Sequence, residues 1–121
     1  MKKMKNHAFR RRLGYALTGI RRTFRSEKSF RTQAALGLAG AGAVLWLQPG
    51  PVWTALVVLA SAHVLGLELV NTALEAALDR IHPGQHPAVG AAKDAAAAAV
   101  LVASVAAAAV GVLMVVSAWR A

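Results

Sequence analysis

The sequence predicts an all-α membrane protein with one amphipathic surface helix followed by three membrane-spanning helices. Hydrophobic residues make up 57% of the 121 residues and charged residues only 16%, which is too apolar for a soluble domain of this length. Eleven of the fourteen Lys and Arg residues precede residue 32, so the net charge of +9 is concentrated at the N-terminus. Three apolar segments follow. We therefore interpret residues 1–121 as a single integral membrane domain.

Residues 7–30 are expected to form the surface helix. Phe9, Leu13, Leu17 and Ile20 recur at spacings of three to four residues, while arginines occupy the rest of the helical circle. Such a helix lies in the membrane interface, where each cation near anionic headgroups contributes about 1 kcal/mol. Nucleic acid is excluded as a partner, because the usual nucleic-acid-binding folds and interleaved stacking aromatics are missing. The basic residues of this region are Lys2, Lys3, Lys5, Arg10, Arg11, Arg12, Arg21, Arg22, Arg25, Lys28 and Arg31.

Residues 32–48, 52–81 and 93–119 are predicted to be the membrane helices. About 20 apolar residues span the roughly 30 Å hydrocarbon core of a bilayer, so the first segment is a little short. It ends at the turn-forming residues 48–51. Small residues within it favour close packing against another helix. They are Gly37, Gly40 and Gly42.

The charge distribution predicts the orientation of the chain. With the N-terminus in the cytoplasm, the eleven early basic residues share one side with Arg80 and Lys93, and Arg120 alone lies on the other. Because Lys and Arg are enriched in cytoplasmic segments, we expect an N-in, C-out topology with the segment from residue 80 to 94 in the cytoplasm.

Four polar side chains share one stripe of the second membrane helix. At about 100° per residue, Glu68, Asn71, Glu75 and Asp79 project in similar directions. A charged side chain costs about 2.5–3.5 kcal/mol at the centre of a membrane helix, so the stripe is not expected to face lipid. It must face another helix, another subunit or water. Three short helices do not shield it by themselves, and we therefore expect self-association.

Two kinds of chemistry suit this stripe. Mg²⁺ binds carboxylate oxygens together with phosphate oxygens, and a carboxylate can also accept the proton of an alcohol during phosphoryl transfer. The alternative is that the acids only pair with Arg or Lys from another helix. Cysteine chemistry is excluded because the chain has no Cys, and no G-x-x-x-x-G-K-[ST] loop is present. We interpret His63 as a packing residue and His82 and His86 as solvated loop residues.

The segments that carry these residues resemble the small prokaryotic diacylglycerol kinase family. Residues 68–79 resemble its E-x-x-N-[ST]-A-[IL]-E-x-x-x-D motif, and residues 27–31 resemble its E-x-x-F-R element. Lys93-Asp94 matches the K-D motif of the family at the expected distance. Gly14-Tyr15 and Gly19 resemble the start of its surface helix. The resemblance extends over about residues 13–119.

The resemblance implies a homotrimeric membrane kinase that transfers the γ-phosphate of MgATP to a lipid hydroxyl, with active sites shared between neighbouring subunits. Glu68 would be the general base, and Glu27 and Glu75 would bind the Mg²⁺ that bridges the ATP phosphates. Lys93 and Asp94 would contact the nucleotide, with Lys93 near phosphate oxygens. The other nucleotide-side positions implied are Tyr15, Gly84, Gln85 and His86. The substrate-side and supporting positions are Ser29, Phe30, Arg31, Asn71 and Asp79.

The resemblance leaves the acceptor lipid open. Diacylglycerol is favoured because Asp79-Arg80 resembles the diacylglycerol branch, and its phosphorylation would yield phosphatidic acid at the inner face of the bacterial cytoplasmic membrane. Undecaprenol, which related members phosphorylate, is the alternative. A non-enzymatic membrane scaffold or a small ion-conducting bundle is the hypothesis from a different class. Gln33 replaces an acid that some relatives carry, so no role is assigned to it.

Overall fold

The structure consists of four α-helices, three of which form a bundle. The computed structural model describes the backbone of residues 2–121 and the side chains of residues 8–121. The side chains of Lys2, Lys3 and Lys5, expected to contribute to headgroup binding, lie outside the described residues. The helices are α1 (Lys2–Ser26), α2 (Lys28–Leu47), α3 (Pro51–Ile81) and α4 (Pro87–Arg120).

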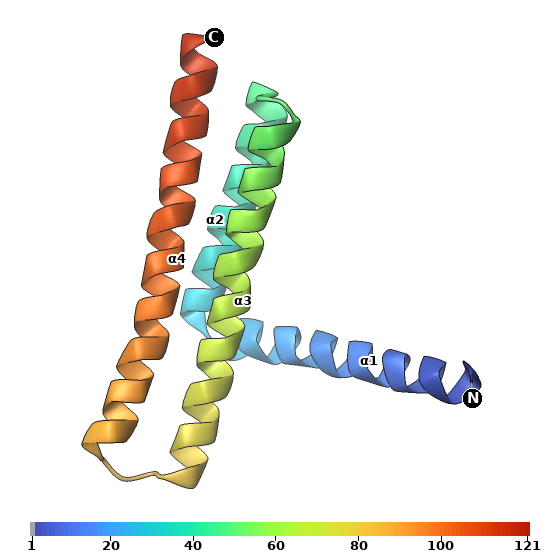
Figure 1. The fold of residues 1–121 in the computed structure, drawn as a ribbon, viewed down its shortest axis with the longest axis vertical. Helices are drawn as coiled ribbons and strands as arrows, with labels where there is room; N and C mark the ends of the chain where they lie inside the picture. The colour runs from blue at the N-terminus through green and yellow to red at the C-terminus, as the bar shows by residue number, and fades with distance from the viewer. Residues whose placement is uncertain (1) are drawn as a thin grey trace.

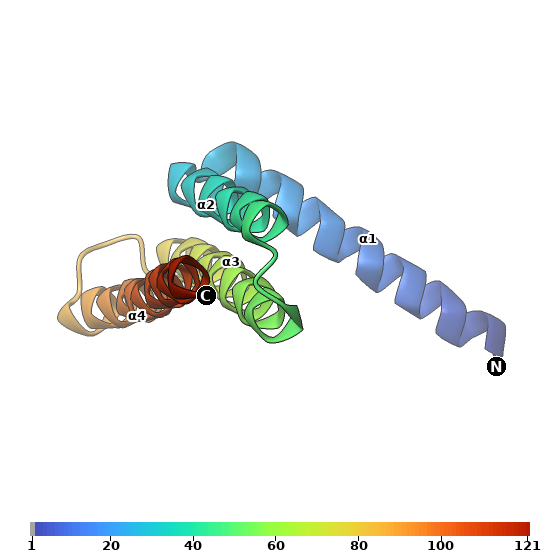
Figure 2. The same ribbon diagram turned by 90° about the horizontal axis from the view of Figure 1, so that it is seen from above.

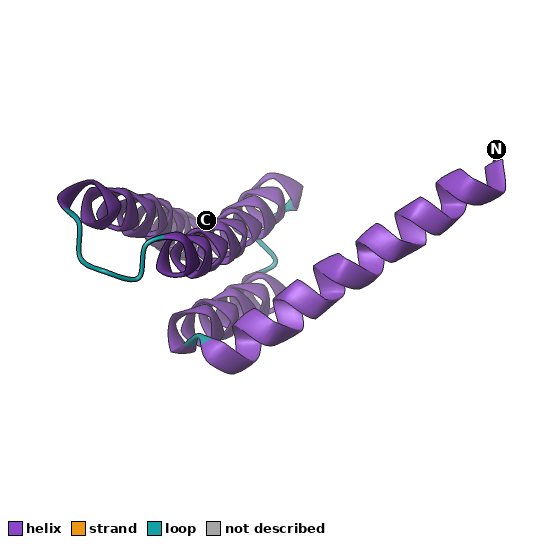
Figure 3. Cartoon of the chain, turned by 90° about the horizontal axis from the view of Figure 1, so that it is seen from below, coloured by secondary structure: helices purple, strands orange, loops and turns teal. Residues whose placement is uncertain are grey.

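Helices α2, α3 and α4 run side by side in alternating directions, whereas α1 projects sideways from the bundle (Figures 1 and 2). Loops are confined to the short connections between the helices (Figure 3). Within the described chain, α3 and α4 are long and apolar enough to cross a membrane. The prediction of an all-α fold is confirmed for the described residues.

Helices α3 and α4 are longer than a bilayer core is thick. Their 31 and 34 residues correspond to about 46 and 51 Å at 1.5 Å per residue, against a core of roughly 30 Å. The ends of both helices next to the α3–α4 loop extend past the level at which α1 leaves the bundle (Figure 1). Part of each helix therefore has to lie outside the hydrocarbon core.

One residue separates α1 from α2. Glu27 has φ −114° and ψ 109°, and its backbone N–H still donates to the carbonyl of Thr23 at 2.8 Å. Residues 28–31 consequently belong to α2, so the surface helix ends earlier, and the first bundle helix begins earlier, than the expected ranges of 7–30 and 32–48. Neither Pro nor Gly occurs at this break, which is why the sequence pattern did not indicate it.

The α2–α3 turn lies where the sequence predicts it. Gln48 adopts a left-handed conformation with φ 49°, and its N–H donates to the carbonyl of Val44 at 2.9 Å. Gly50 has φ 100° and ψ 169°, a region that a side chain would make costly. Pro51 then begins α3, where its missing N–H is not needed.

Helix α4 begins six residues before the expected start at residue 93. His86 precedes its first turn, and the His86 Nδ1 atom accepts a hydrogen bond from the N–H of Ala88 at 3.1 Å. Pro87 occupies the first helical position. This cap accounts for the early start, because it satisfies one of the N–H groups that every helix leaves free at its N-terminus.

Helix α3 lies between the other two bundle helices and packs against both, whereas α2 and α4 touch each other little. Close approach of α2 to α3 depends on two of the expected glycines. A Cβ atom on Gly40 would lie 3.3 Å from Cγ1 of Val57, and one on Gly37 would lie 3.6 Å from Cβ of Ser61. Gly42, by contrast, faces open space. The buried side chains of the bundle include Val57, Val64, Ala103 and Met114.

Candidate functional site

The most buried acid of the described chain is Glu68, on α3. Its side chain is 3% exposed, and its Oε1 atom accepts a hydrogen bond from the hydroxyl of Ser29 at 2.5 Å. Ser29 reaches it from the first turn of α2, directly after the break at Glu27. The contact joins the E-x-x-F-R segment to the stripe on α3, two regions that are 39 residues apart in the sequence. Burial of a carboxylate requires such a donor.

The next two polar residues of the stripe are less enclosed. Asn71 and Glu75 are half-buried on α3. The Asn71 Oδ1 atom is inaccessible to solvent and has no hydrogen-bond donor among the described residues. A buried acceptor without a donor is unfavourable by about 1–3 kcal/mol, so Asn71 is the residue of the stripe whose hydrogen bonding is incomplete among the described residues.

The stripe ends in an ion pair. The Lys93 ammonium on α4 donates to Oδ1 of Asp79 on α3 at 2.5 Å. The resemblance to the kinase family implies that Lys93 lies near phosphate oxygens. In this structure, Lys93 pairs with the carboxylate of Asp79 instead. Asp94, the next residue, is exposed. The pair holds the two helices together on the side of the α3–α4 loop, where it is solvent-accessible.

The residues around the break at Glu27 fix the angle between α1 and α2. The Arg31 Nη1 atom donates to the carbonyls of Phe24 at 2.7 Å and Arg25 at 3.0 Å, which are among the last carbonyls of α1. A cation at a helix C-terminus also interacts favourably with the helix dipole. Phe30 is buried and packs edge-on against Phe24, with ring centroids 6.5 Å apart. Phe30 and Arg31 therefore have structural roles within the chain.

Glu27 lies at the break between α1 and α2. It is half-buried and makes no cap hydrogen bond to α2. Across the described residues, no three His, Cys, Asp or Glu side chains come together as a metal site. A hard cation held by Glu27 or Glu75 would thus need further oxygen ligands, which the phosphates of a nucleotide can provide. The carboxylates have the right chemistry for Mg²⁺ only in combination with such a ligand.

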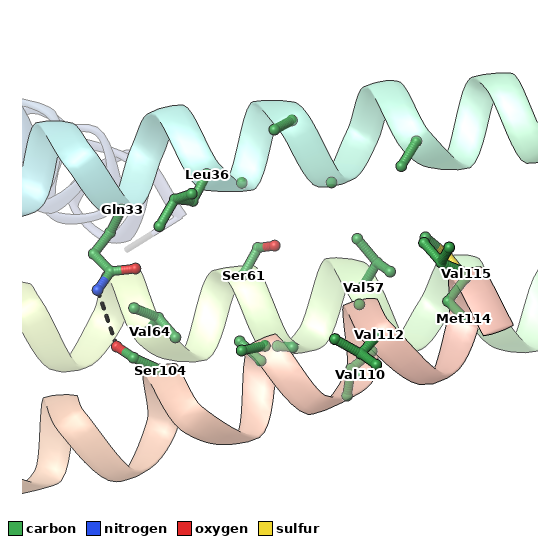
Figure 4. A pocket seen from close by; sticks show the side chains of 18 residues that line it. Gln33, Leu36, Val57, Ser61, Val64, Ser104, Val110, Val112, Met114 and Val115 are labelled. Atoms are coloured by element: carbon green, nitrogen blue, oxygen red, sulfur yellow. Dashed lines mark hydrogen bonds between the residues drawn. The ribbon is translucent and has the colours of Figure 1, made fainter.

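A cavity of about 450 Å³ lies between α2, α3 and α4 (Figure 4). Its lining is mostly apolar, with Val57, Val64 and Met114 among its walls. Gln33 and Ser104 form a polar boundary at one end, where the Gln33 Nε2 atom donates to the Ser104 hydroxyl at 2.9 Å (Figure 4). Val64 lies one helical turn before Glu68 on α3, and Gln33 lies one turn after Ser29 on α2. The polar end of the cavity therefore lies about one helical turn from the buried carboxylate along the same two helices.

Neither Gln33 nor Ser104 was predicted to contribute to the site. Ser104 is the one hydrogen-bonding side chain in residues 95–116, and it also donates to the carbonyl of Val100 at 2.8 Å. Its isolation in an apolar helix was the available signal, because a polar group in such a helix needs a partner.

The expected nucleotide-side positions are not brought to Glu68 within one chain. Tyr15 is exposed on α1, which leads away from the bundle (Figure 1). Gly84, Gln85 and His86 lie in the exposed α3–α4 loop. The rings of His82 and His86 meet edge-on with centroids 5.5 Å apart, and His86 caps α4 as described above. The prediction that these histidines are exposed loop residues is confirmed.

The family comparison agrees with this arrangement. Residues 14–115 match the family described as prokaryotic diacylglycerol kinase. The chain belongs to this family. The matched segment contains the Ser29–Glu68 contact, the Asp79–Lys93 pair and the whole cavity, so the features described above all lie in the shared part of the family.

Individual relatives carry two different names. The chain is 33% identical over 90 residues to the diacylglycerol kinase of Escherichia coli strain K12, an alignment that covers 74% of each chain. It is 35% identical over 100 residues to the undecaprenol kinase of Bacillus subtilis strain 168, covering 83% of this chain and 81% of the relative. A diacylglycerol kinase of Synechocystis is 38% identical over 98 residues, covering 80% of this chain and 56% of the relative.

This family member is therefore a lipid kinase, and the hypothesis of a non-enzymatic scaffold is set aside. Membership also supports its character as a membrane protein, in agreement with the two apolar helices α3 and α4. Relatives named for different acceptor lipids have similar identities to this chain, so the identities do not decide the acceptor.

Proposed function

We propose that this lipid kinase transfers the γ-phosphoryl group of ATP to the hydroxyl of diacylglycerol, producing phosphatidic acid and ADP. The observation that carries the proposal is the buried Glu68 carboxylate, which Ser29 holds one helical turn beyond the apolar cavity. A lipid whose hydrocarbon occupies the cavity would present its polar end to this carboxylate. The base would then meet the acceptor hydroxyl with little competing water.

Glu68 acts as general base in this mechanism. Its Oε1 atom is taken by the Ser29 hydroxyl, which leaves Oε2 to accept the proton of the lipid hydroxyl. As that proton moves to Glu68, the lipid oxygen forms a bond to the γ-phosphorus, and the bond from the γ-phosphorus to the leaving oxygen of ADP breaks. Asn71 would orient neighbouring groups by hydrogen bonding, and its unpartnered Oδ1 atom supports this role.

The nucleotide is held by the remaining charged residues. Glu27 and Glu75 are the ligands for Mg²⁺, which would neutralise charge on the ATP phosphates when bound with them. Lys93 exchanges its ion pair with Asp79 for a phosphate oxygen, and Asp94 contacts the nucleotide beside it. The exposure of the Asp79–Lys93 pair supports this exchange, because an exposed ion pair contributes only about 0–1 kcal/mol.

The membrane arrangement that we propose is a three-span, N-in, C-out protein of the bacterial cytoplasmic membrane. Helix α1 lies in the interface, supported by exposed apolar side chains such as Phe9, Leu13 and Leu17 and by its sideways course from the bundle (Figure 1). The ends of α3 and α4 that extend past α1 then project into the cytoplasm, where ATP is. The acidic side chains carried by these ends would then lie in water and not in the hydrocarbon core.

A homotrimer with shared active sites completes the proposal. Support comes from the incomplete site of a single chain, since no three potential metal ligands gather among the described residues and Tyr15 is carried away from Glu68 on α1. A neighbouring copy would supply the missing nucleotide contacts. Undecaprenol remains the second candidate acceptor, because the Bacillus subtilis relative named for it is 35% identical to this chain.

The test is a transfer assay on the purified chain in mixed micelles with labelled MgATP, with diacylglycerol and undecaprenol supplied separately. Diacylglycerol is expected to give the larger kcat/KM. Glu68→Gln should reduce kcat by about 10²- to 10⁴-fold, the usual contribution of a general base, while Glu68→Asp retains a carboxylate and should lose less. Undiminished transfer by Glu68→Gln would remove the base assignment, and preference for undecaprenol would replace the acceptor.

A further inference from the structure

A hydrogen bond between Gln33 and Ser104 joins α2 to α4, two helices that otherwise touch each other little. The Ser104 hydroxyl has one hydrogen, which it donates to the carbonyl of Val100 at 2.8 Å. Its oxygen is therefore the acceptor for the Gln33 Nε2 atom at 2.9 Å. This contact orients the Gln33 amide at the polar end of the cavity (Figure 4).

One N–H of the Gln33 amide has no partner in the part of the chain that the structure describes. A glutamine NH₂ group has two donors, and the contact with Ser104 uses one of them. Gln33 is half-buried and lines the cavity, whose walls are mostly apolar. In the proposed membrane arrangement it lies about 9 Å along α2 beyond the break at Glu27, more than the roughly 5–8 Å of interface on each side of a bilayer. A free donor at this depth needs an acceptor, since hydrocarbon offers none.

The spacing between Gln33 and the Glu68 contact suits one class of lipid. Gln33 follows Ser29, the partner of Glu68, by one helical turn, or about 6 Å along α2. In diacylglycerol, five bonds join the hydroxyl oxygen to the carbonyl oxygen of the ester on the central glycerol carbon, an extended length of about 6 Å. A hydroxyl placed at Glu68 therefore brings this ester carbonyl to the level of Gln33.

We propose that the Gln33 amide binds the central ester carbonyl of the acceptor lipid, with Ser104 as the residue that positions the amide. The free N–H donates to the ester oxygen, and the acyl chain of that ester enters the cavity between α2, α3 and α4. Both ends of the glycerol unit are then held, the hydroxyl at Glu68 and the ester at Gln33. The inference rests on the proposed function, because it takes Glu68 as the residue that meets the hydroxyl.

The contact selects ester lipids over polyprenols. A polyprenol has a hydroxyl but no ester, so its hydrocarbon would leave the Gln33 N–H without an acceptor. A site built to form a hydrogen bond discriminates against a ligand that lacks the partner group, because its own polar group is then left unpaired. Gln33 and Ser104 are thus the residues that determine the class of acceptor, whereas Glu68 meets the hydroxyl of either class.

The first test compares two acceptors that differ only in their esters. Dioctanoylglycerol and the matching dialkylglycerol, in which ether links replace both esters, are supplied to the purified chain with labelled MgATP in alkyl maltoside micelles. In Gln33→Met, the ratio of kcat/KM for the diester to that for the diether should fall by about 2- to 13-fold, the range for one neutral hydrogen bond. Ser104→Ala leaves the amide free to rotate and should lower the ratio by a smaller factor.

Ser61→Ala is the matched control for this ratio. Ser61 also places a hydroxyl in the cavity wall, but it lies about two turns before Glu68 on α3, beyond the level of the ester (Figure 4). The control should keep the native ratio. Damage to the fold would lower transfer to both lipids together and leave the ratio unaltered, so the ratio separates a contact with the ester from a structural role.

Infrared spectroscopy tests the same contact without phosphoryl transfer. A hydrogen bond to an ester carbonyl lowers its stretching frequency, and a carbon-13 label in the central ester separates its band from that of the other ester. With dioctanoylglycerol labelled in this way and no nucleotide, the native chain and Ser61→Ala should show the lowered band. Gln33→Met should not show it.

The outcomes separate the alternatives. A diester-to-diether ratio in Gln33→Met equal to that of the native chain, or a lowered carbonyl band that persists in Gln33→Met, would overturn the proposal. A ratio that fell as far in Ser61→Ala would do the same. Absence of transfer to either lipid, with the lowered band present in the native chain and lost in Gln33→Met, would contradict the proposed function and leave the ester contact standing.

Discussion

The contact between α2 and α3 provides the sharpest test of the bundle, through the substitution Gly40→Leu. Its added Cβ would lie 3.3 Å from Cγ1 of Val57, closer than ordinary van der Waals contact, and Val57 is buried and cannot simply rotate into solvent. The remaining carbons of leucine would extend further into the same interface. The two helices must therefore separate, or the core around Val57 must repack.

Two opposing contributions determine how much Gly40→Leu changes the free energy of unfolding. Overpacking of a well-packed core costs about 1–3 kcal/mol. Replacing a helical glycine by a residue with a side chain stabilises the helix by about 0.5–1 kcal/mol. We therefore expect Gly40→Leu to lower the free energy of unfolding by about 1 kcal/mol, the difference between the midpoints of these two ranges. In Gly40→Ala the terms nearly cancel, because Val57 has to move by only a few tenths of an ångström.

Reversible unfolding in mixed micelles with increasing SDS, followed by tryptophan fluorescence, measures this difference. Gly42→Leu is the matched control, since it lies on the same helix and faces open space. It should be as stable as the native chain or slightly more so. If Gly40→Leu and Gly42→Leu unfolded at the same SDS fraction, the result would contradict the conclusion that close packing of α2 on α3 requires glycine at position 40.

Two further predictions concern the break between α1 and α2. Ser29→Ala removes the donor that positions the Glu68 carboxylate; because a misplacement of about 1 Å can reduce a rate by about 10²-fold, kcat in the lipid kinase assay should fall by up to about 10²-fold. Ser29→Thr keeps the hydroxyl and should retain most activity, and equal rates for both variants would contradict a role for this bond. Arg31→Gln weakens the link to the end of α1, so the distance distribution between spin labels on α1 and α2 should broaden. Lys28→Gln removes a neighbouring cation without that link, and similar broadening in both variants would refute the specific role of Arg31.

Much of the fold was predictable because hydropathy and helix-breaking residues agree along most of the chain. The range predicted for the second membrane helix, 52–81, is almost that of α3, since Pro and Gly precede it and a proline-containing loop follows. Helical spacing also predicted that Glu68 would face another helix, another subunit or water instead of lipid, and its hydrogen bond to Ser29 shows that it faces α2. The local sequence pattern was therefore sufficient to predict both the bounds of α3 and the side of the helix on which Glu68 lies.

The break at Glu27 was not predictable in the same way. It depends on tertiary contacts of Phe30 and Arg31 with the end of α1, which a local pattern does not contain. The partner of Asp79 was predictable only in kind, as an Arg or Lys from another helix. Asp79 pairs with Lys93, because the short loop brings the start of α4 beside the end of α3.

The single-residue connection at Glu27 also limits how the chain can vary in length. Two long helices joined without a flexible linker are coupled in rotation as well as in direction. One residue inserted near the end of α1 would turn everything before it by about 100° around the helix axis. In the membrane arrangement that we propose, the apolar stripe of α1 would then leave the interface and arginines would take its place. Substitutions in α1 can be absorbed one at a time, but an insertion or deletion would change the orientation of the entire helix.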